Sequence, residues 1–226
     1  MSSATSENPD GQVELLANRE RRTANSEAER KAKSDSAITA FVLAGGRSSR
    51  MGSDKALLSF GHQNLLQLAL QTVAAISPKA YIVGSERRYG GFGAVVEDIY
   101  PGCGPLGGIH AALTSTDTDR NLILSVDMPR MTAVFLRWLI AKAETKSQLI
   151  VVPDAAGGLQ PLCATYRKAV AVIAEQALQQ GHYKIGHLFS QVPTCIIAEC
   201  EILAAGFSPQ LFHNVNTPEE YVNCRS

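Results

Sequence analysis

From residue 38 onward, short apolar runs alternate with segments whose apolar residues recur at helical spacing. The expected strands cover residues 38–44, 80–83, 94–96, 122–126, 149–152, 161–166 and 195–198. The expected helices cover residues 65–76, a short helix that begins over 109–113, one capped by Thr132, and 168–179. This alternation predicts an α/β fold of Rossmann-like type, a mostly parallel sheet with helices on both faces.

Ligands of such sheets bind beyond the carboxyl ends of the strands, often where the connections that follow two neighbouring strands run in opposite directions. The loops that follow Ala44, Val83, Val96 and Val126 are therefore the places where we expect a binding site.

The first 36 residues differ in composition from the rest of the chain. They are rich in Ser, Glu, Arg, Asn and Ala, with Val13, Leu15 and Leu16 as bulky apolar residues. Such a segment buries too little surface to offset the entropy lost on ordering. We expect a disordered tail over 1–36 and one catalytic domain over 37–226. A protein that interacts with partners through this tail is an alternative.

Charge and cysteine content exclude several classes of partner. Lysine plus arginine and aspartate plus glutamate number 21 each, so no basic field favours a nucleic acid or an anionic membrane. The five cysteines form no close Cys-x-x-Cys pair, which fits a reducing compartment. No apolar run approaches the ~20 residues of a membrane span, and the N-terminus lacks the apolar stretch of a secretory signal. We expect a cytoplasmic protein that binds any anionic ligand at a local site.

The loop after the first strand reads LAGGRSSRMGSDK and combines paired glycines with three cations. Gly45 and Gly46 allow close approach of the backbone to a ligand, and Arg47, Arg50 and Lys55 supply positive charge. This combination suits a triphosphate. The spacing matches neither a P-loop nor Gly-x-Gly-x-x-Gly. A basic surface loop without a ligand is the alternative.

Two acidic residues follow strands. Asp127 ends the apolar run 122–126, where a carboxylate can hold a metal ion that bridges phosphate oxygens. Its alternative role is to cap the next helix, for which Thr132 is better placed. Asp98 follows the strand 94–96, and a carboxylate there can accept both the N1–H and the N2 amine of guanine. In isolation, a solvated loop acid would be the preferred interpretation of Asp98.

Two further segments carry ligand-binding residue types. The stretch PGCGPLGG at 101–108, with Gly104, Pro105, Gly107 and Gly108, predicts an open loop that leads into a helix N-terminus. Near the C-terminus, Asn214 and Asn216 point the same way if they lie on a strand. Their amides suit contact with a substrate or with metal-bound water, and fixing the helix that starts at 217–220 is the rival role.

Together these motifs closely resemble the signature of molybdenum cofactor guanylyltransferases, a branch of the nucleotidyltransferase superfamily that also makes sugar nucleotides. The resemblance covers about residues 38–223 and implies GTP as donor, Mg²⁺ as cofactor and release of pyrophosphate. The paired glycines favour the guanylyl over the cytidylyl branch. The implied nucleotide-binding residues are Leu43, Ala44, Gly45, Gly46, Lys55, Asp98 and Asp127, and Asp127 is the implied Mg²⁺ ligand.

The resemblance also implies an acceptor site. Its residues are Gly104, Pro105, Gly107, Gly108, Gln160, Lys184, Asn214 and Asn216. One departure stands out, because the family often has an asparagine just after the second strand. This chain has Gly84 and Ser85 there, so one guanine-side contact is lost or replaced.

The resulting hypothesis is transfer of GMP from GTP to molybdopterin, with Lys55, Arg47, Arg50 and Asp127 as catalytic residues. The alternatives are a related nucleotidyltransferase that uses CTP or a sugar phosphate, and a non-catalytic nucleotide-binding module. We expect a monomer or weak homo-oligomer that contacts proteins which deliver the cofactor or carry it.

Overall fold

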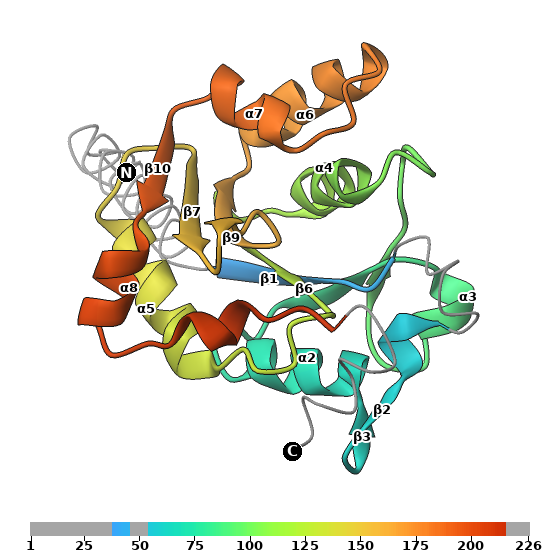
Figure 1. Cartoon of the computed structure of the whole chain (residues 1–226). Helices are drawn as coiled ribbons and strands as arrows, with labels where there is room; N and C mark the ends of the chain where they lie inside the picture. Colours follow the sequence, from blue (N-terminus) through green and yellow to red (C-terminus); the bar gives the residue numbers. More distant parts are fainter. Residues whose placement is uncertain (1–37, 46–53, 216–226) are drawn as a thin grey trace, which may run out of the picture. The chain divides into compact units, whose positions relative to one another are not determined.

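The computed structural model describes residues 38–45 and 54–215. Its centre is an eight-stranded sheet in the order β10-β7-β9-β6-β1-β4-β5, with β8 paired to β7 (Figure 1). The strands are β1 (Ile38–Leu43), β4 (Ala80–Val83), β5 (Val95–Val96), β6 (Arg120–Ser125), β7 (Ile150–Ala155), β8 (Gly158–Leu159), β9 (Cys163–Arg167) and β10 (Thr194–Ile197).

The half of the sheet built from β6, β1, β4 and β5 is entirely parallel. Leu43 of β1 stands beside Ser125 of β6 and Val83 of β4, so these three strands end at the same level. In the other half, β9 runs antiparallel to both β6 and β7, whereas β10 runs parallel to β7. The predicted mostly parallel α/β fold is therefore confirmed, with β9 as the reversed strand between two parallel groups.

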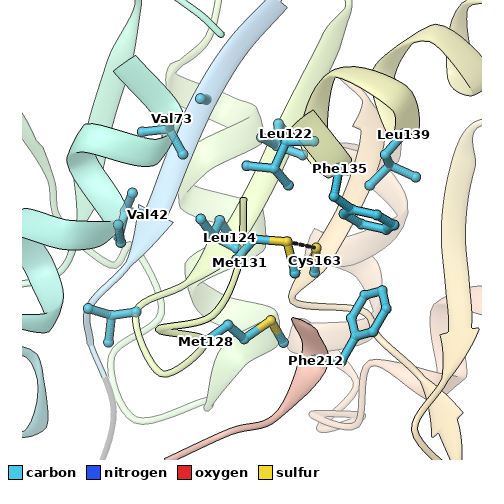
Figure 2. Packing of buried hydrophobic residues seen from close by; sticks show 14 of the residues in the cluster. Val42, Val73, Leu122, Leu124, Met128, Met131, Phe135, Leu139, Cys163 and Phe212 are labelled. Carbon is cyan, nitrogen blue, oxygen red and sulfur yellow. Dashed lines mark hydrogen bonds between the residues drawn. The ribbon is translucent and has the colours of Figure 1, made fainter. Parts of the chain in front are cut away.

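Helices cover both faces of the sheet, as the alternation along the chain predicts (Figure 1). One face carries α2 (Leu65–Ala74), α5 (Ala133–Glu144) and α8 (Glu199–Ala204), and the other carries α4 (Pro105–Ser115), α6 (Val170–Gln179) and α7 (Gly186–Gln191). Successive strand side chains point to opposite faces. Val42 thus packs with the first helix layer, shown in Figure 2, and Phe41 packs with the second.

The helix predicted to begin at 109 in fact begins at Pro105. Gly104 precedes it with φ of 69°, a conformation that favours glycine, and Pro105 occupies the first turn, where its missing N–H costs nothing. Two glycines expected in a loop, Gly107 and Gly108, consequently lie inside a buried helix.

Several short elements were not predicted because they carry no periodic pattern. They are the 3-10 helices η1 (Lys55–Leu57) and η2 (Pro209–Phe212), the hairpin β2 (Ser59–Phe60) and β3 (Gln63–Asn64), α3 (Glu86–Tyr89), β8, α7 and α8. The tail predicted over 1–36 and the helix start at 217–220 lie outside the described residues. Across 38–45 and 54–215, no helix is long and apolar enough to cross a membrane.

Candidate active site

The carboxyl ends of β1, β4 and β5 border a pocket of about 300 Å³. It is lined by Gly45, Gly84, Ser85, Arg88, Tyr89, Glu97, Asp98 and Pro101. Three of the four loops predicted to carry a site, those after Ala44, Val83 and Val96, therefore meet at this pocket. They meet because the strands before them are neighbours in the sheet.

The fourth loop, after Val126, carries Asp127, which forms an ion pair with Lys55. The Lys55 Nζ and Asp127 Oδ2 atoms are 2.9 Å apart, and the two side chains are 16% and 20% exposed. Asp127 lies just beyond β6, where the Val126 N–H still donates to the Leu43 carbonyl of β1. The phosphate-binding lysine and the metal-binding aspartate expected from the sequence thus lie side by side, next to the end of β1.

An N-cap fixes the start of the short helix η1, whose first residue is Lys55. Asp54 is the N-cap of η1, and its carboxylate accepts a hydrogen bond of 3.1 Å from the Ala56 N–H. Ala56 is fully buried, which anchors the short helix to the core. The N-cap of α5 is Thr132 rather than Asp127, as expected, because the Thr132 hydroxyl accepts from the Phe135 N–H.

Two buried oxygens at this edge have no hydrogen-bond partner among the described residues. They are Asp127 Oδ1 and Asn214 Oδ1. The Val215 N–H donates to the Asp127 carbonyl at 2.9 Å, which brings the C-terminal segment with Asn214 next to Asp127. A buried acceptor without a donor is costly, so this pair of oxygens suggests a ligand or cation that completes the site.

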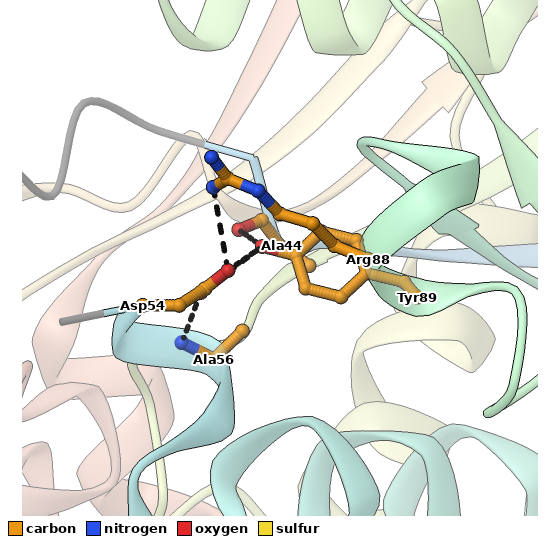
Figure 3. A network of polar contacts seen from close by, with 5 residues as sticks. All are labelled: Ala44, Asp54, Ala56, Arg88 and Tyr89. Atoms are coloured by element: carbon orange, nitrogen blue, oxygen red, sulfur yellow. Dashed lines mark hydrogen bonds and ion pairs between the residues drawn. The ribbon is translucent and has the colours of Figure 1, made fainter.

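Tyr89 forms a second polar connection at the pocket (Figure 3). Its hydroxyl lies 3.2 Å from the Ala44 carbonyl oxygen and 2.9 and 3.0 Å from the two Asp54 carboxylate oxygens. Burial and the neighbouring Asp54 carboxylate raise the pKa of Tyr89 to about 12, so the phenol keeps its proton. The Arg88 guanidinium donates to Asp54 at 3.4 Å from the exposed side.

Gly84, one of the two residues at the position of the expected asparagine, packs against the Tyr89 ring. A Cβ atom at position 84 would lie 2.7 Å from Cε2 of Tyr89, closer than such atoms approach in proteins. A side chain at position 84 would therefore clash with the tyrosine ring. Sequence reasoning missed Tyr89 and Arg88, because a tyrosine in a short charged segment gives no signal of what it packs against.

The two acids after β5 have different surroundings. Glu97 accepts a hydrogen bond of 3.0 Å from the Glu86 N–H and so holds the start of α3. Asp98 lines the pocket, and partial loss of its hydration raises its pKa above the ordinary 3.8. Asp98, the carboxylate predicted to contact guanine, therefore lines the pocket, whereas Glu97 is bonded to the start of α3.

The first-strand residues expected to contact the nucleotide use backbone groups in hydrogen bonds with neighbouring strands. The Leu43 carbonyl accepts from Val126, and the N–H groups of Ala44 and Gly45 both donate to the Val83 carbonyl. Gly45 lines the pocket while its N–H donates to the Val83 carbonyl, so this amide already has an acceptor within the protein. The predicted residues Gly46, Arg47, Arg50 and Asn216 lie outside the described residues.

The helical glycines of the predicted acceptor loop have a packing explanation. A Cβ atom at Gly107 would lie 2.9 Å from the Tyr100 carbonyl oxygen, and one at Gly108 would lie 3.4 Å from side-chain atoms of Leu43 and Val83. Both glycines are buried, whereas Gly104 and Pro105 at the start of α4 are exposed. Of the four residues predicted to contact the acceptor here, Gly104 and Pro105 are thus the two that a ligand could touch directly.

Gln160 and Lys184, which are also predicted to contact the acceptor, differ in their surroundings. The Gln160 carboxamide donates to the carbonyls of Ala155 and Gly158, at 2.8 and 3.2 Å, and so closes the β7–β8 hairpin. Only its oxygen remains for a ligand. Lys184 is exposed between α6 and α7. The structure gives neither residue a contact with the Lys55–Asp127 pair.

Comparison with known proteins yields one consistent family. The family described as MobA-like NTP transferase domain matches residues 40–193. A probable molybdenum cofactor guanylyltransferase of Pelotomaculum thermopropionicum is 32% identical over 83% of this chain and 91% of its own length. A molybdenum cofactor guanylyltransferase of Desulfosudis oleivorans is 30% identical over 81% of this chain and 92% of its own.

Solved structures share the fold. Molybdopterin-guanine dinucleotide biosynthesis protein A of Archaeoglobus fulgidus superimposes with a TM-score of 0.74 at 22% identity, covering 83% of this chain and 96% of its own. The 4-diphosphocytidyl-2C-methyl-D-erythritol synthase of Anaerococcus prevotii gives a TM-score of 0.62 at 11% identity, over 84% and 96%. The architecture is thus shared with an enzyme named for a cytidyl product. The sequence matches nevertheless agree on one group, and the chain belongs to the MobA-like family of NTP transferases.

Proposed function

We propose that this nucleotidyltransferase moves GMP from GTP to the terminal phosphate of molybdopterin, which yields the guanine dinucleotide form of the cofactor and pyrophosphate. The names of the sequence relatives support this assignment. The observation that carries it is the Lys55–Asp127 pair at the same sheet edge as a pocket bordered by Asp98. We assign the pocket to the base of the nucleotide and the Lys55–Asp127 pair to its phosphates.

At the base end, we propose that the Asp98 carboxylate accepts the N1–H and N2 amine of guanine. Cytosine does not present two such donors in this arrangement, so Asp98 favours GTP over CTP. The raised pKa of Asp98 shows that its charge is incompletely solvated in the free protein, and two donors from the base would restore the lost hydrogen bonds.

At the phosphate end, an ionised oxygen of the acceptor phosphate attacks the α-phosphorus of GTP. The bond from that phosphorus to the bridging oxygen breaks, and pyrophosphate leaves with the electron pair. No general base is needed, because the attacking oxygen carries no proton. The protein's task is therefore positioning and charge neutralisation. Lys55 would supply positive charge to the leaving phosphates, and Arg47 and Arg50 are proposed to assist it.

The described oxygens fit a bound Mg²⁺. Asp127 Oδ1 and Asn214 Oδ1 are buried acceptors without donors and belong to adjacent segments, which suits a hard cation. Across the described ranges, no group of three or more His, Cys, Asp or Glu side chains could hold a metal. A magnesium ion held by one or two protein oxygens and the substrate's phosphates needs no such group. When bound, Mg²⁺ would neutralise phosphate charge and orient the donor.

For the acceptor, we propose contacts from the exposed start of α4 at Gly104 and Pro105, from Gln160, and from Asn214. Gly107 and Gly108 would contribute by setting the position of α4. Lys184 and Asn216 remain proposed acceptor contacts. We expect the protein to act in the cytoplasm as a monomer or weak homo-oligomer, in contact with proteins that deliver the cofactor or carry it.

A coupled assay tests the function. The purified protein is mixed with Mg²⁺, molybdopterin and either GTP or CTP, and pyrophosphate and the dinucleotide product are measured. We expect product with GTP only, and none from Asp127→Ala. If the product formed faster with CTP than with GTP, CTP would be the donor and the proposed use of GTP would be wrong. No pyrophosphate with any nucleotide would instead identify a non-catalytic nucleotide-binding module.

A further inference from the structure

We propose that Tyr89 is a positioning residue for Lys55, a role that rests on the proposed transfer of GMP. Its hydroxyl joins the chain before residues 46–53, at Ala44, to the chain after them, at Asp54. In this way Tyr89 would fix Lys55 relative to the pocket and to Asp127. Hydrogen bonds lead from Tyr89 to Asp54 and on into η1, so Tyr89 would act through these groups.

Tyr89 is held in place by packing and by hydrogen bonds. The residue is 2% exposed, and its ring packs against Gly84, where a Cβ atom would lie 2.7 Å from the ring. The phenol has one proton and three acceptor oxygens within 3.2 Å, from Ala44 and Asp54. A buried tyrosine with this geometry holds its hydroxyl in one place, and the raised pKa keeps the proton on it.

Asp54 links the position of the Tyr89 hydroxyl to that of Lys55. The Asp54 carboxylate accepts from the Ala56 N–H inside η1 and faces the Tyr89 hydroxyl. Lys55 is the intervening first residue of η1, and its ammonium reaches Asp127 at 2.9 Å. A shift of Asp54 would therefore move the start of η1 and the Lys55 ammonium with it.

Tyr89 also borders the pocket, together with Arg88, which donates to the same Asp54 carboxylate. Tyr89 is thus shared between the base pocket and the lysine of the phosphate site. A residue in this position can set the distance between the two ends of one bound nucleotide. Such positioning affects the reaction step strongly, since a displacement of about 1 Å can cost roughly 100-fold in rate.

The substitution Tyr89→Phe tests this role, because it removes the hydroxyl and leaves the ring on Gly84. We expect kcat to fall about 10- to 100-fold, with a change of less than about 3-fold in KM for GTP. A residue that only stabilises the fold would lower the melting temperature and leave kcat of the folded enzyme unchanged.

Tyr166→Phe is the matched control. The Tyr166 hydroxyl is also buried and donates to a carbonyl, that of Pro161, at 2.7 Å, and it has no contact with Asp54. Both substitutions remove one buried hydrogen bond, so we expect similar losses of melting temperature. Only Tyr89→Phe should lower the rate of GTP turnover.

A double-mutant cycle with Lys55→Ala separates positioning from an independent effect. If Tyr89 acts through Lys55, Tyr89→Phe should add less than about 3-fold to the loss caused by Lys55→Ala. Full additivity, or unchanged kcat in Tyr89→Phe beside an active wild type, would overturn the role of Tyr89 and leave the proposed function intact. A wild-type protein without GTP turnover would overturn both.

Discussion

At the scale of single residues, Lys55 and Asp127 combine a modest structural role with a large proposed catalytic one. Both side chains remain 16% and 20% exposed, so water can solvate either charge when its partner is removed. We expect Lys55→Ala to change the free energy of unfolding by about 1 to 2 kcal/mol. The lost charge stabilisation should lower kcat about 100- to 1000-fold, roughly 3 to 4 kcal/mol of barrier.

Urea unfolding and single-turnover kinetics on the same Lys55→Ala preparation measure the two effects separately. A rate within about 3-fold of wild type would contradict the proposed role of Lys55 at the leaving phosphates. Lys142→Ala provides a control, because Lys142 pairs with Glu201 at 3.3 Å on the surface and should affect neither quantity much.

Asp98 predicts a pH dependence of GTP binding. Its pKa in the free protein lies above 3.8 because of lost hydration, and two donors from guanine would stabilise the ionised form and lower this pKa. Protonation of Asp98 therefore competes with GTP. Affinity should fall as the pH drops through the free-protein pKa and level off above it.

Isothermal titration with GTP at several pH values, in buffers of different ionisation enthalpy, measures this effect as release of a proton on binding. In Asp98→Asn the proton release should vanish, and affinity should be weaker at neutral pH. The same pH dependence in Asp98→Asn would assign the titration to another group and remove the support for the guanine contact.

At the scale of elements, α4 illustrates how neighbouring glycines can differ. Alanine favours a helix interior over glycine by about 1 kcal/mol. At Gly107 this gain is outweighed, because the new Cβ would lie 2.9 Å from the Tyr100 backbone carbonyl. At Gly108 the Cβ would meet Leu43 and Val83 side chains at 3.4 Å, which can yield slightly.

We therefore expect Gly107→Ala to destabilise the protein by about 1 to 3 kcal/mol and Gly108→Ala to be nearly neutral. Chemical denaturation of the two variants in parallel measures the difference. Equal stability of both variants would show that α4 can move away from Tyr100, and would weaken the packing explanation for Gly107.

At the scale of the whole molecule, the boundary of the catalytic domain is the testable feature. The first strand begins at Ile38, and the family match begins at residue 40. We expect a chain that starts at residue 37 to retain the melting temperature and the kcat/KM of the full chain. Loss of activity with a preserved melting temperature would instead assign residues 1–36 a direct part in the reaction.

The sequence alone determined the α/β class, the main strands and helices, and the placement of Asp127 directly after a buried strand. These predictions succeeded because hydrophobic periodicity reflects which face of each element is buried, and this pattern is encoded locally. Asp98 also reaches the predicted pocket. The start of α4 was predicted four residues late, since Gly107 and Gly108 resemble loop residues in the absence of their neighbours.

Only the tertiary structure decided why particular small or buried residues are needed. Gly84 makes room for Tyr89, Gly107 makes room for the Tyr100 carbonyl, and Asn214 reaches Asp127 through a single backbone hydrogen bond from Val215. The contact of Asp127 with the C-terminal segment joins parts of the chain that are far apart, whereas the two glycine contacts depend on how loops fold back onto neighbouring elements. Periodicity describes which face of an element is buried, but not which atom lies opposite, and that close packing is set when the layers meet.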